Sequence, residues 1–191
     1  MEVKKILQTV NRLLKLDLSD SLFNKTALDN ELTSELNYGS TLSKLVDCAN
    51  LVIDDLATKF YPIKDTLWYV SVDNIIPYAV FSGQLHEVVK ITIDNEPIDF
   101  TYCEQGVKCG CNGKMEITYL RRPAPIDFLS NVFVGSPKIT TFTLAYGVCA
   151  EYCLLEGLYD DMSIWDNLYK VSLSAVSVDC REKKLPCRRW F

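Results

Sequence analysis

The chain has 191 residues, of which 48% are hydrophobic and 24% are charged, with a formal net charge of -5 and an isoelectric point of about 5.0. These values exclude wholesale disorder, and the length suffices for one sizeable domain or one domain with an insertion. The acidic balance argues against a primary nucleic-acid binder, which needs a basic face to neutralise phosphates. The sequence shows no run of 18 apolar residues and no secretory leader, so we expect no membrane span and reduced cysteines.

The first part of the chain predicts two helices. Residues 2–16 place apolar side chains at helical spacing, and residues 41–59 repeat this pattern until Pro62 prevents continuation. The polar stretch 17–40, with Gly39 near its end, is interpreted as a connection. The two apolar stripes consist of Val3, Ile6, Leu7, Val10, Leu13 and Leu14, and of Leu42, Leu45, Val46, Ala49, Val52, Ile53 and Leu56.

From about residue 66 to residue 120 the hydrophobic period changes from 3.6 to 2, which predicts strands. We expect an antiparallel meander of about four strands, with 67–72 and 78–81 as candidate additional strands. Asp94-Asn-Glu-Pro97 predicts a turn between two of these strands. Asn112-Gly113 is a two-residue hairpin signal that would join 107–111 to 114–119. The side chains expected to share buried faces are Val89, Ile91 and Ile93 in one strand, and Met115, Ile117 and Tyr119 in another.

Two further helices are predicted after a proline-containing loop at 121–137. They cover residues 140–157 and 159–176, and Gly157 separates them. The second helix is expected to use one face for Trp165, Leu168, Tyr169, Ser172, Ala175 and Val176.

The order of these elements predicts an α+β fold, in which a helical bundle carries an inserted antiparallel β-meander. We divide the chain into N-terminal helices at 1–64, the β insertion at 65–120, C-terminal helices completing the bundle at 121–178, and a docking tail at 179–191.

The sharpest chemical candidate is the cysteine group Cys103, Cys109 and Cys111. Positions 109 and 111 are two apart on a predicted strand, so both thiols are expected on one face, with Cys103 on the preceding strand. Thiolates suit a soft metal, but structural zinc needs four ligands, and neither a fourth cysteine nor His86 is well placed. We therefore expect unpaired thiols, no metal and no cofactor. A small cytosolic metal-binding module built on this hairpin is the alternative.

No nucleotide-binding, hydrolase or metalloprotease motif occurs, and His86 is the only histidine. The adjacent carboxylates Asp54-Asp55 and Asp160-Asp161 are interpreted as surface or helix-capping charges. The sequence therefore predicts a protein that is not an enzyme.

The sequence ends in Cys187-Arg-Arg-Trp-Phe191, whereas a free end normally carries small or polar residues. Trp and Arg are enriched in interface hot spots, so we expect this end to dock into a partner; folding back on its own domain is the alternative. Arg121 and Arg122 stand where the last strand exits. They are either a solvated strand end or a contact to a neighbouring subunit.

At these residues the sequence resembles the head-to-tail adaptor (connector) proteins of tailed bacteriophages, including the tail tubular A proteins of short-tailed phages. The resemblance covers roughly residues 40–191. The pieces that carry it are Ile117-Thr-Tyr-Leu-Arg-Arg-Pro-Ala-Pro125, Leu144-Ala-Tyr-Gly-Val-Cys-Ala-Glu-Tyr-Cys-Leu-Leu-Glu-Gly157, Ile164-Trp-Asp-Asn-Leu-Tyr-Lys170 and the Arg-Arg-Trp end. The 2–16 helix and the cysteine-rich hairpin depart from the family pattern.

The resemblance implies a structural virion protein that is made in the host cytoplasm and located in the neck, at the head-tail junction. Such adaptors form a ring with identical neighbours, commonly twelve-fold, beneath the portal protein. They join it to the downstream tail or neck protein and let DNA pass without sequence-specific binding. A stopper or tail-completion protein is the rival virion role. The implied portal-docking residues are Cys187, Arg188, Arg189, Trp190 and Phe191, and the subunit-interface candidates are Arg121 and Arg122.

Overall fold

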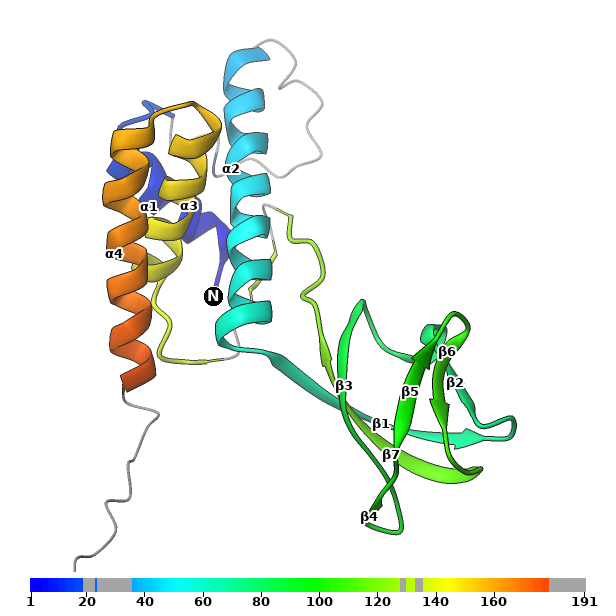
Figure 1. Cartoon of the computed structure of the whole chain (residues 1–191). Helices are drawn as coiled ribbons and strands as arrows, with labels where there is room; N and C mark the ends of the chain where they lie inside the picture. Colours follow the sequence, from blue (N-terminus) through cyan, green and yellow to red (C-terminus); the bar gives the residue numbers. More distant parts are fainter. Residues whose placement is uncertain (19–22, 24–35, 128–129, 133–135, 179–191) are drawn as a thin grey trace, which may run out of the picture. The chain divides into compact units, whose positions relative to one another are not determined.

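The computed structural model describes residues 1–18, 23, 36–127, 130–132 and 136–178. It divides into two compact units, shown in Figure 1. The helical unit takes its described residues from Met1–Val52, Asp127–Val132 and Ser136–Phe191, and the β unit takes its own from Ile53–Ile126 and Phe133–Gly135. Within these residues, four α-helices and two antiparallel sheets confirm the α+β fold class with a β-meander insertion.

The helical unit is organised around α3, Thr141–Leu155, which packs against both α1, Val3–Leu14, and α4, Tyr159–Val178 (Figure 1). Nine of its fifteen residues are buried, as expected of a helix with neighbours on several sides. The Thr140 side chain caps α3 by accepting a hydrogen bond from the Thr143 N–H at 3.2 Å.

The predicted stripe of α1 is confirmed at four positions, Val3, Ile6, Leu7 and Val10, which are buried. Backbone bonds hold the start of this helix against a distant segment. The Val3 N–H donates to the Ser130 carbonyl at 3.2 Å, and the Val132 N–H donates to the Met1 carbonyl at 2.7 Å. The first residues of the chain are thereby part of the folded unit.

The second helix, α2, spans Leu36–Asp55 and therefore begins earlier than predicted. The connection interpreted as ending at Gly39 ends by residue 35, because Gly39 lies inside the helix; most of the rest of 17–40 lies outside the described residues. A π-helical turn, Leu56–Phe60, follows α2, and Pro62 prevents further helix.

The predicted face of α4 is partly wrong. Up to residue 176, where side chains are described, Tyr169 and Leu173 are the buried residues of this helix, while Leu168 and Ala175 are exposed. Trp165 is only half-buried, with its ring stacked on that of Tyr146 at 6.0 Å between centroids. Leu168 and Tyr169 were both predicted to be on the buried face, but successive residues point about 100° apart around a helix. Tyr169 packs on α3, and Leu168 is therefore turned away from it.

The β unit contains two antiparallel sheets with a common core. One has the strand order β1-β7-β3-β4 and the other β2-β6-β5 (Figure 1). The strand bounds are Ile63–Ser71 for β1, Ile75–Pro77 for β2, Leu85–Ile93 for β3, Glu96–Pro97 for β4, Phe100–Cys103 for β5, Gly106–Cys109 for β6 and Gly113–Arg121 for β7. The buried core of the unit consists of Ile76, Phe81, Val88, Ile91, Val107, Cys109, Met115, Ile117 and Tyr119.

Several local predictions for the strands are confirmed. Met115, Ile117 and Tyr119 are buried together on β7. The turn predicted at 94–97 is a two-residue hairpin between β3 and β4, in which Asp94 and Asn95 both have positive φ, of 50° and 69°. Positive φ at both central residues is the requirement of the turn type that fits the twist of a hairpin.

Three local predictions are wrong. Asn112-Gly113 does not close a hairpin, because β6 pairs with β2 and β5 while β7 pairs with β1 and β3. The Asn112 side chain instead accepts a hydrogen bond from the Asn74 N–H at 2.7 Å where the chain changes sheet. Residues 78–80 form a 3-10 turn rather than a strand. Two register shifts in β3 bury Val88 and leave Val89 exposed, against the predicted alternation.

Candidate partner interface

The docking segment predicted from the sequence is at the C-terminal end of the chain. Cys187, Arg188, Arg189, Trp190 and Phe191 lie outside the described residues. Portal docking by this segment therefore stays a prediction.

Arg121 and Arg122, the predicted interface candidates, both reach carboxylates of the β unit. The Arg122 guanidinium donates to Asp54 Oδ2 at 3.4 Å, and Arg121 Nε lies 3.5 Å from Asp65 Oδ2, too far for a well-formed hydrogen bond. Both pairs are partly exposed, so each adds little stability. Both side chains therefore have carboxylate partners within the β unit. Their role in a contact between subunits stays a prediction.

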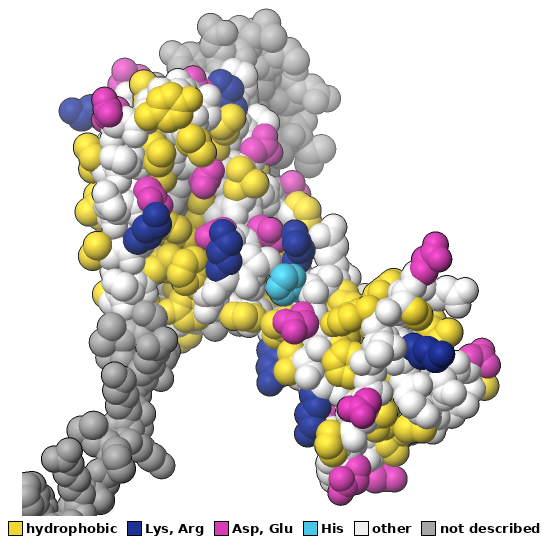
Figure 2. All heavy atoms as spheres, viewed as in Figure 1, with side chains coloured by type: hydrophobic (Ala, Val, Ile, Leu, Met, Phe, Trp, Pro, Cys, Tyr) yellow, Lys and Arg dark blue, Asp and Glu magenta, His cyan; other side chains and the backbone are white. Residues whose placement is uncertain are grey.

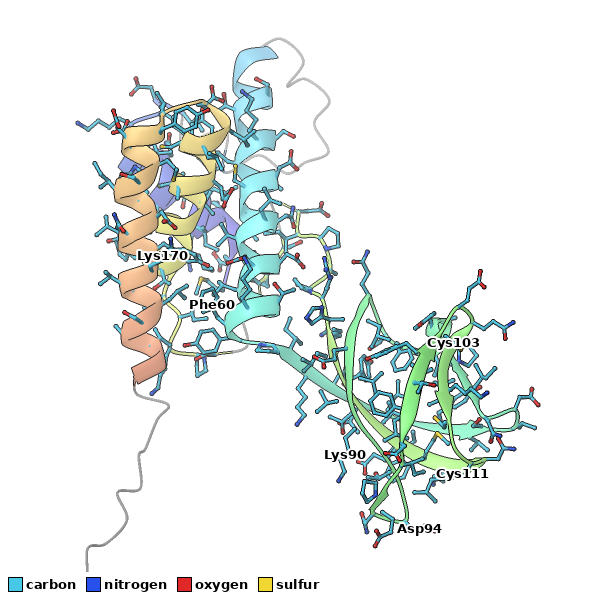
Figure 3. The ribbon with its side chains drawn as sticks, viewed as in Figure 1. Phe60, Lys90, Asp94, Cys103, Cys111 and Lys170 are labelled. Atoms are coloured by element: carbon cyan, nitrogen blue, oxygen red, sulfur yellow. The ribbon has the colours of Figure 1, made fainter. Side chains whose placement is uncertain are left out.

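The three cysteines of the predicted hairpin do not converge. Cys109 is buried and its sulfur lies 4.0 Å from Met115 Sδ, whereas Cys111 is exposed beyond the end of β6. The expectation that both thiols share one face is wrong, because the strand ends at Cys109. Cys103 and Cys111 lie at opposite ends of the β5–β6 hairpin (Figure 3). Within the described residues no group of three or more His, Cys, Asp and Glu side chains could hold a metal ion.

His86 lies on β3 at the wall of an open pocket with a volume of about 520 Å³. Two tyrosines of this wall already use their hydroxyls: Tyr78 donates to the Cys103 carbonyl at 2.9 Å, and Tyr102 accepts from the Val88 N–H at 2.7 Å. No carboxylate or thiol is among the described residues that line the pocket. Besides His86, the titratable side chains among these described lining residues are the two tyrosines, whose hydroxyls are already hydrogen-bonded.

A second apolar line on α4 is the feature that the sequence analysis missed. Ile164, Leu168 and Val171 are 57%, 41% and 66% exposed, and with Ala175 they form what we call the α4 seam. Their spacing of four, three and four residues places them in one line along the helix, well away from Tyr169 and Leu173. Hydrophobic side chains are visible on the surface of the helical unit in Figure 2.

The charges in the middle of α4 lie away from this line, whereas Asp160 and Asp161 in the first turn lie one turn before Ile164. Asp166 and Lys170 pair with each other at 2.5 Å, one turn apart, and Lys170 extends from the helix in Figure 3. The residues that flank the α4 seam include Asn167, Ser172 and Ser174, which are neutral. Apolar residues spaced four and three apart are typical of a helix that packs against another helix.

More apolar surface is exposed at the α3–α4 turn, which carries Leu154, Leu155, Leu158 and Tyr159. A hydrogen bond and ion pair of 2.6 Å between Lys44 and Glu156 ties this turn to α2. The hydrogen bond to the Glu156 carboxylate, together with its charge, raises the pKa of Lys44. The turn is thus held in place by a charged contact while its leucines face outwards.

The β unit exposes a separate apolar row, formed by Trp68, Val70 and Val72 at 63%, 60% and 74% exposure. Trp68 and Val70 point to the same face of the sheet because they are two residues apart on β1. The Lys114 ammonium lies 5.1 Å from the Trp68 ring centroid, a cation–π distance.

Comparisons with known proteins add no assignment: no model of a known protein family matches the chain, and no curated protein matches it. Among the described residues, no helix is long and apolar enough to cross a membrane.

Proposed function

We propose that this chain is a structural subunit of a larger particle, and specifically a head-to-tail adaptor of a tailed bacteriophage. In this role it forms a ring with identical neighbours beneath the portal protein and carries the next tail or neck component. DNA passes without sequence-specific binding, in keeping with the net charge of -5. The proposal rests on the resemblance of the 117–125, 144–157 and 164–170 segments, and on one structural observation, the α4 seam.

The α4 seam supports a role in an assembly because a helix exposed to water on one side normally keeps a single apolar stripe. Here α4 has a buried line through Tyr169 and Leu173 and an exposed line through Ile164, Leu168 and Val171. Burying three aliphatic side chains that are already partly covered is worth about 1 kcal/mol each. Repeated at every contact of a ring, such modest contributions hold a particle together through avidity.

The test is to image the purified full chain by electron microscopy, alone and mixed with the portal protein of the same phage. We expect rings, and we expect Leu168→Asp to abolish them because a carboxylate in the α4 seam would have to be buried. Ser163→Asp is the matched control. It places the same charge on an exposed position of α4, about 100° around the helix from Ile164.

The proposal fails if Leu168→Asp, still folded by circular dichroism, forms rings as readily as the unmodified chain does. It also fails if particles assembled without this chain have tails attached. A stopper or tail-completion protein would use the same kind of surface. Localisation of the chain in particles by cryo-electron microscopy separates these roles, because only the adaptor contacts the portal directly.

A further inference from the structure

The open pocket beside His86 has aromatic walls that hydrogen bonds hold in place. Tyr78 and Tyr102 are 41% and 52% exposed, and each uses its hydroxyl on the backbone of another segment. Tyr78 donates to the Cys103 carbonyl at 2.9 Å, and Tyr102 accepts from the Val88 N–H at 2.7 Å. A ring fixed in this way loses little conformational freedom when a ligand packs on it, so both walls are preorganised for binding.

A β-bulge brings the single histidine of the chain to this pocket. The register shift between Leu85 and Glu87 leaves His86 as an extra residue of β3 without a partner on β7. Bulges of this kind re-aim a side chain. His86 lines the pocket together with Gln84, and neither side chain has a hydrogen-bond partner among the described residues. Both side chains are therefore available to a ligand.

The openness of the pocket, which has a volume of about 520 Å³, favours a peptide over a small molecule. A small-molecule site surrounds most of its ligand, whereas an open site suits a chain that continues beyond it at both ends.

A peptide strand cannot be added to β3 at this point, because the outer backbone groups of β3 already have partners. The Val88 N–H is bonded to Tyr102, and the Ile91 carbonyl accepts from the Ile98 N–H at 2.9 Å. Recognition is therefore left to side chains. Aromatic walls with polar side chains between them are the combination that binds a polyproline II segment.

Carboxylates stand on two sides of the pocket. Glu87 follows His86 on β3, and Glu104 follows Cys103, whose carbonyl is bonded to Tyr78. We call Glu87 and Glu104 the rim glutamates. Both are exposed, and neither is in an ion pair among the described residues. Lys and Arg are absent from the described residues that line the pocket, so its rim attracts a cation.

Two cations lie near the pocket, but each of them has a carboxylate partner. Arg121 lies opposite β3 at the end of β7, and Arg122 follows it. Their guanidinium groups lie 3.5 Å and 3.4 Å from the carboxylates of Asp65 and Asp54. Each arginine is thus balanced in charge, and the charge left at the pocket is that of the rim glutamates.

We infer that this pocket binds a proline-containing segment of another protein in the polyproline II conformation, with Lys or Arg beside the prolines. Proline rings pack on the tyrosine walls, and Gln84 and His86 donate to the peptide carbonyls, which polyproline II leaves free. The basic residue pairs with the rim glutamates in an exposed contact that salt screens. This binding concerns the β unit alone and does not depend on the adaptor role.

The test selects ligands for the purified full chain from a random peptide library. We expect the selected peptides to be enriched in proline with Lys or Arg beside it. Fluorescence anisotropy of a labelled selected peptide then gives its Kd. Tyr78→Ala should raise this Kd about tenfold, because it removes one wall of the pocket. Trp68→Ala is the matched control, since Trp68 is an exposed aromatic residue of the same unit outside the described wall.

The charge of the rim is tested with Glu104→Lys. It should raise the Kd about fivefold at low salt, and the difference should shrink at high salt. Glu96→Lys is the control, because Glu96 is an exposed carboxylate on β4 and is not among the described residues of the wall. All these variants should still form rings, so a failure of this inference is distinguishable from a failure of the proposed function.

Selection of no peptide, or of peptides without proline or with acidic flanks, overturns the inference. A folded Tyr78→Ala chain that binds as tightly as Trp68→Ala also overturns it. If Tyr78→Ala does not fold, His86→Ala decides the matter by the same comparison with Trp68→Ala. Tighter binding of a peptide of residues 179–191 than of the selected peptides would make the chain itself the occupant and overturn the inference as well.

Discussion

Gly147 of α3 and Tyr169 of α4 pack backbone to ring: a methyl group on Gly147 would lie 3.1 Å from Tyr169 Cε2 and 2.8 Å from Val52 Cγ1. The absence of a side chain at this position therefore sets the approach of α4 and α2 to the central helix. It explains why a residue of poor helix propensity stands in the middle of α3.

Gly147→Ala is expected to destabilise the helical unit by about 1 kcal/mol. The gain in helix propensity of about 1 kcal/mol is outweighed by overpacking that costs about 1–3 kcal/mol. Chemical denaturation measures the difference. In a double-mutant cycle, adding Val52→Ala should recover part of the loss, because it removes the closer contact. A fully stable Gly147→Ala would show that the helices shift freely around this point.

A pair of matched truncations tests whether the α4 seam is free in the isolated chain. Leu173→Ala should cost about 2–4 kcal/mol, since this side chain is only 3% exposed. Leu168→Ala, on the same helix and with the same chemistry, should change the free energy of unfolding by less than about 0.5 kcal/mol. The comparison is made at low protein concentration. Equal losses would mean that Leu168 is buried in the folded monomer.

Thiol labelling should distinguish the described cysteines sharply. Burial raises the pKa of Cys48 to about 12 and that of Cys149 to about 12, whereas Cys111 is exposed. The thiolate is the reactive species, so an alkylating agent at pH 8 should modify Cys111 quickly and Cys48 and Cys149 only after unfolding. Peptide mass mapping gives the order. Early modification of Cys149 would contradict the burial of α3.

The same buried thiols predict a loss of stability at alkaline pH. The ordinary pKa is 9.0, and the folded value for Cys149 is about 12, so the folded state holds its proton more tightly. This contribution is complete below pH 9 and is lost as pH rises towards 12, at up to about 1.4 kcal/mol per pH unit for each thiol. Denaturation curves between pH 8 and 11 should show the decline. Cys149→Ala should make it shallower, while Cys111→Ala should not.

Deletion of residues 187–191 should leave the melting temperature within about 1 °C and abolish attachment to purified portal protein. An aromatic residue in a partner pocket, with arginines paired to carboxylates, is the usual anchor of an interface, and its loss costs about 2 kcal/mol or more at each copy. Deletion of 182–184 with the terminal segment retained is the control for tail length. Unchanged portal affinity after removal of 187–191 would end the docking hypothesis.

The sequence alone predicted the elements better than their partners. Helical periodicity located α1, α3 and α4, and the Asp94-Asn95 turn was readable because its chemistry is local. Asn112-Gly113 misled because a hairpin signal says nothing about which strand has the better core contacts. β7 pairs with β1 and β3, which lie far away in sequence. The register shifts in β3 likewise leave no local signal, so the exposure of Val89 could not be predicted.

The α4 seam was visible in the sequence, since Ile164, Leu168 and Val171 follow helical spacing. It was not recognised because Leu168 belongs by spacing both to the predicted buried face, with Trp165 and Ser172, and to the line of Ile164 and Val171. Only the packing of Tyr169 and Leu173 on α3 decides which face is buried.

The strands of the β unit begin and end at one place. Ile63, the first residue of β1, is paired with Arg121, the last residue of β7, and Arg122 bonds to Asp54 near the end of α2. An insert whose two ends meet can be lengthened, exchanged or removed without stretching the helices that carry it. The strands can therefore change in sequence or length while the helical unit is preserved. For the same reason, a different domain could be inserted between residues 62 and 122.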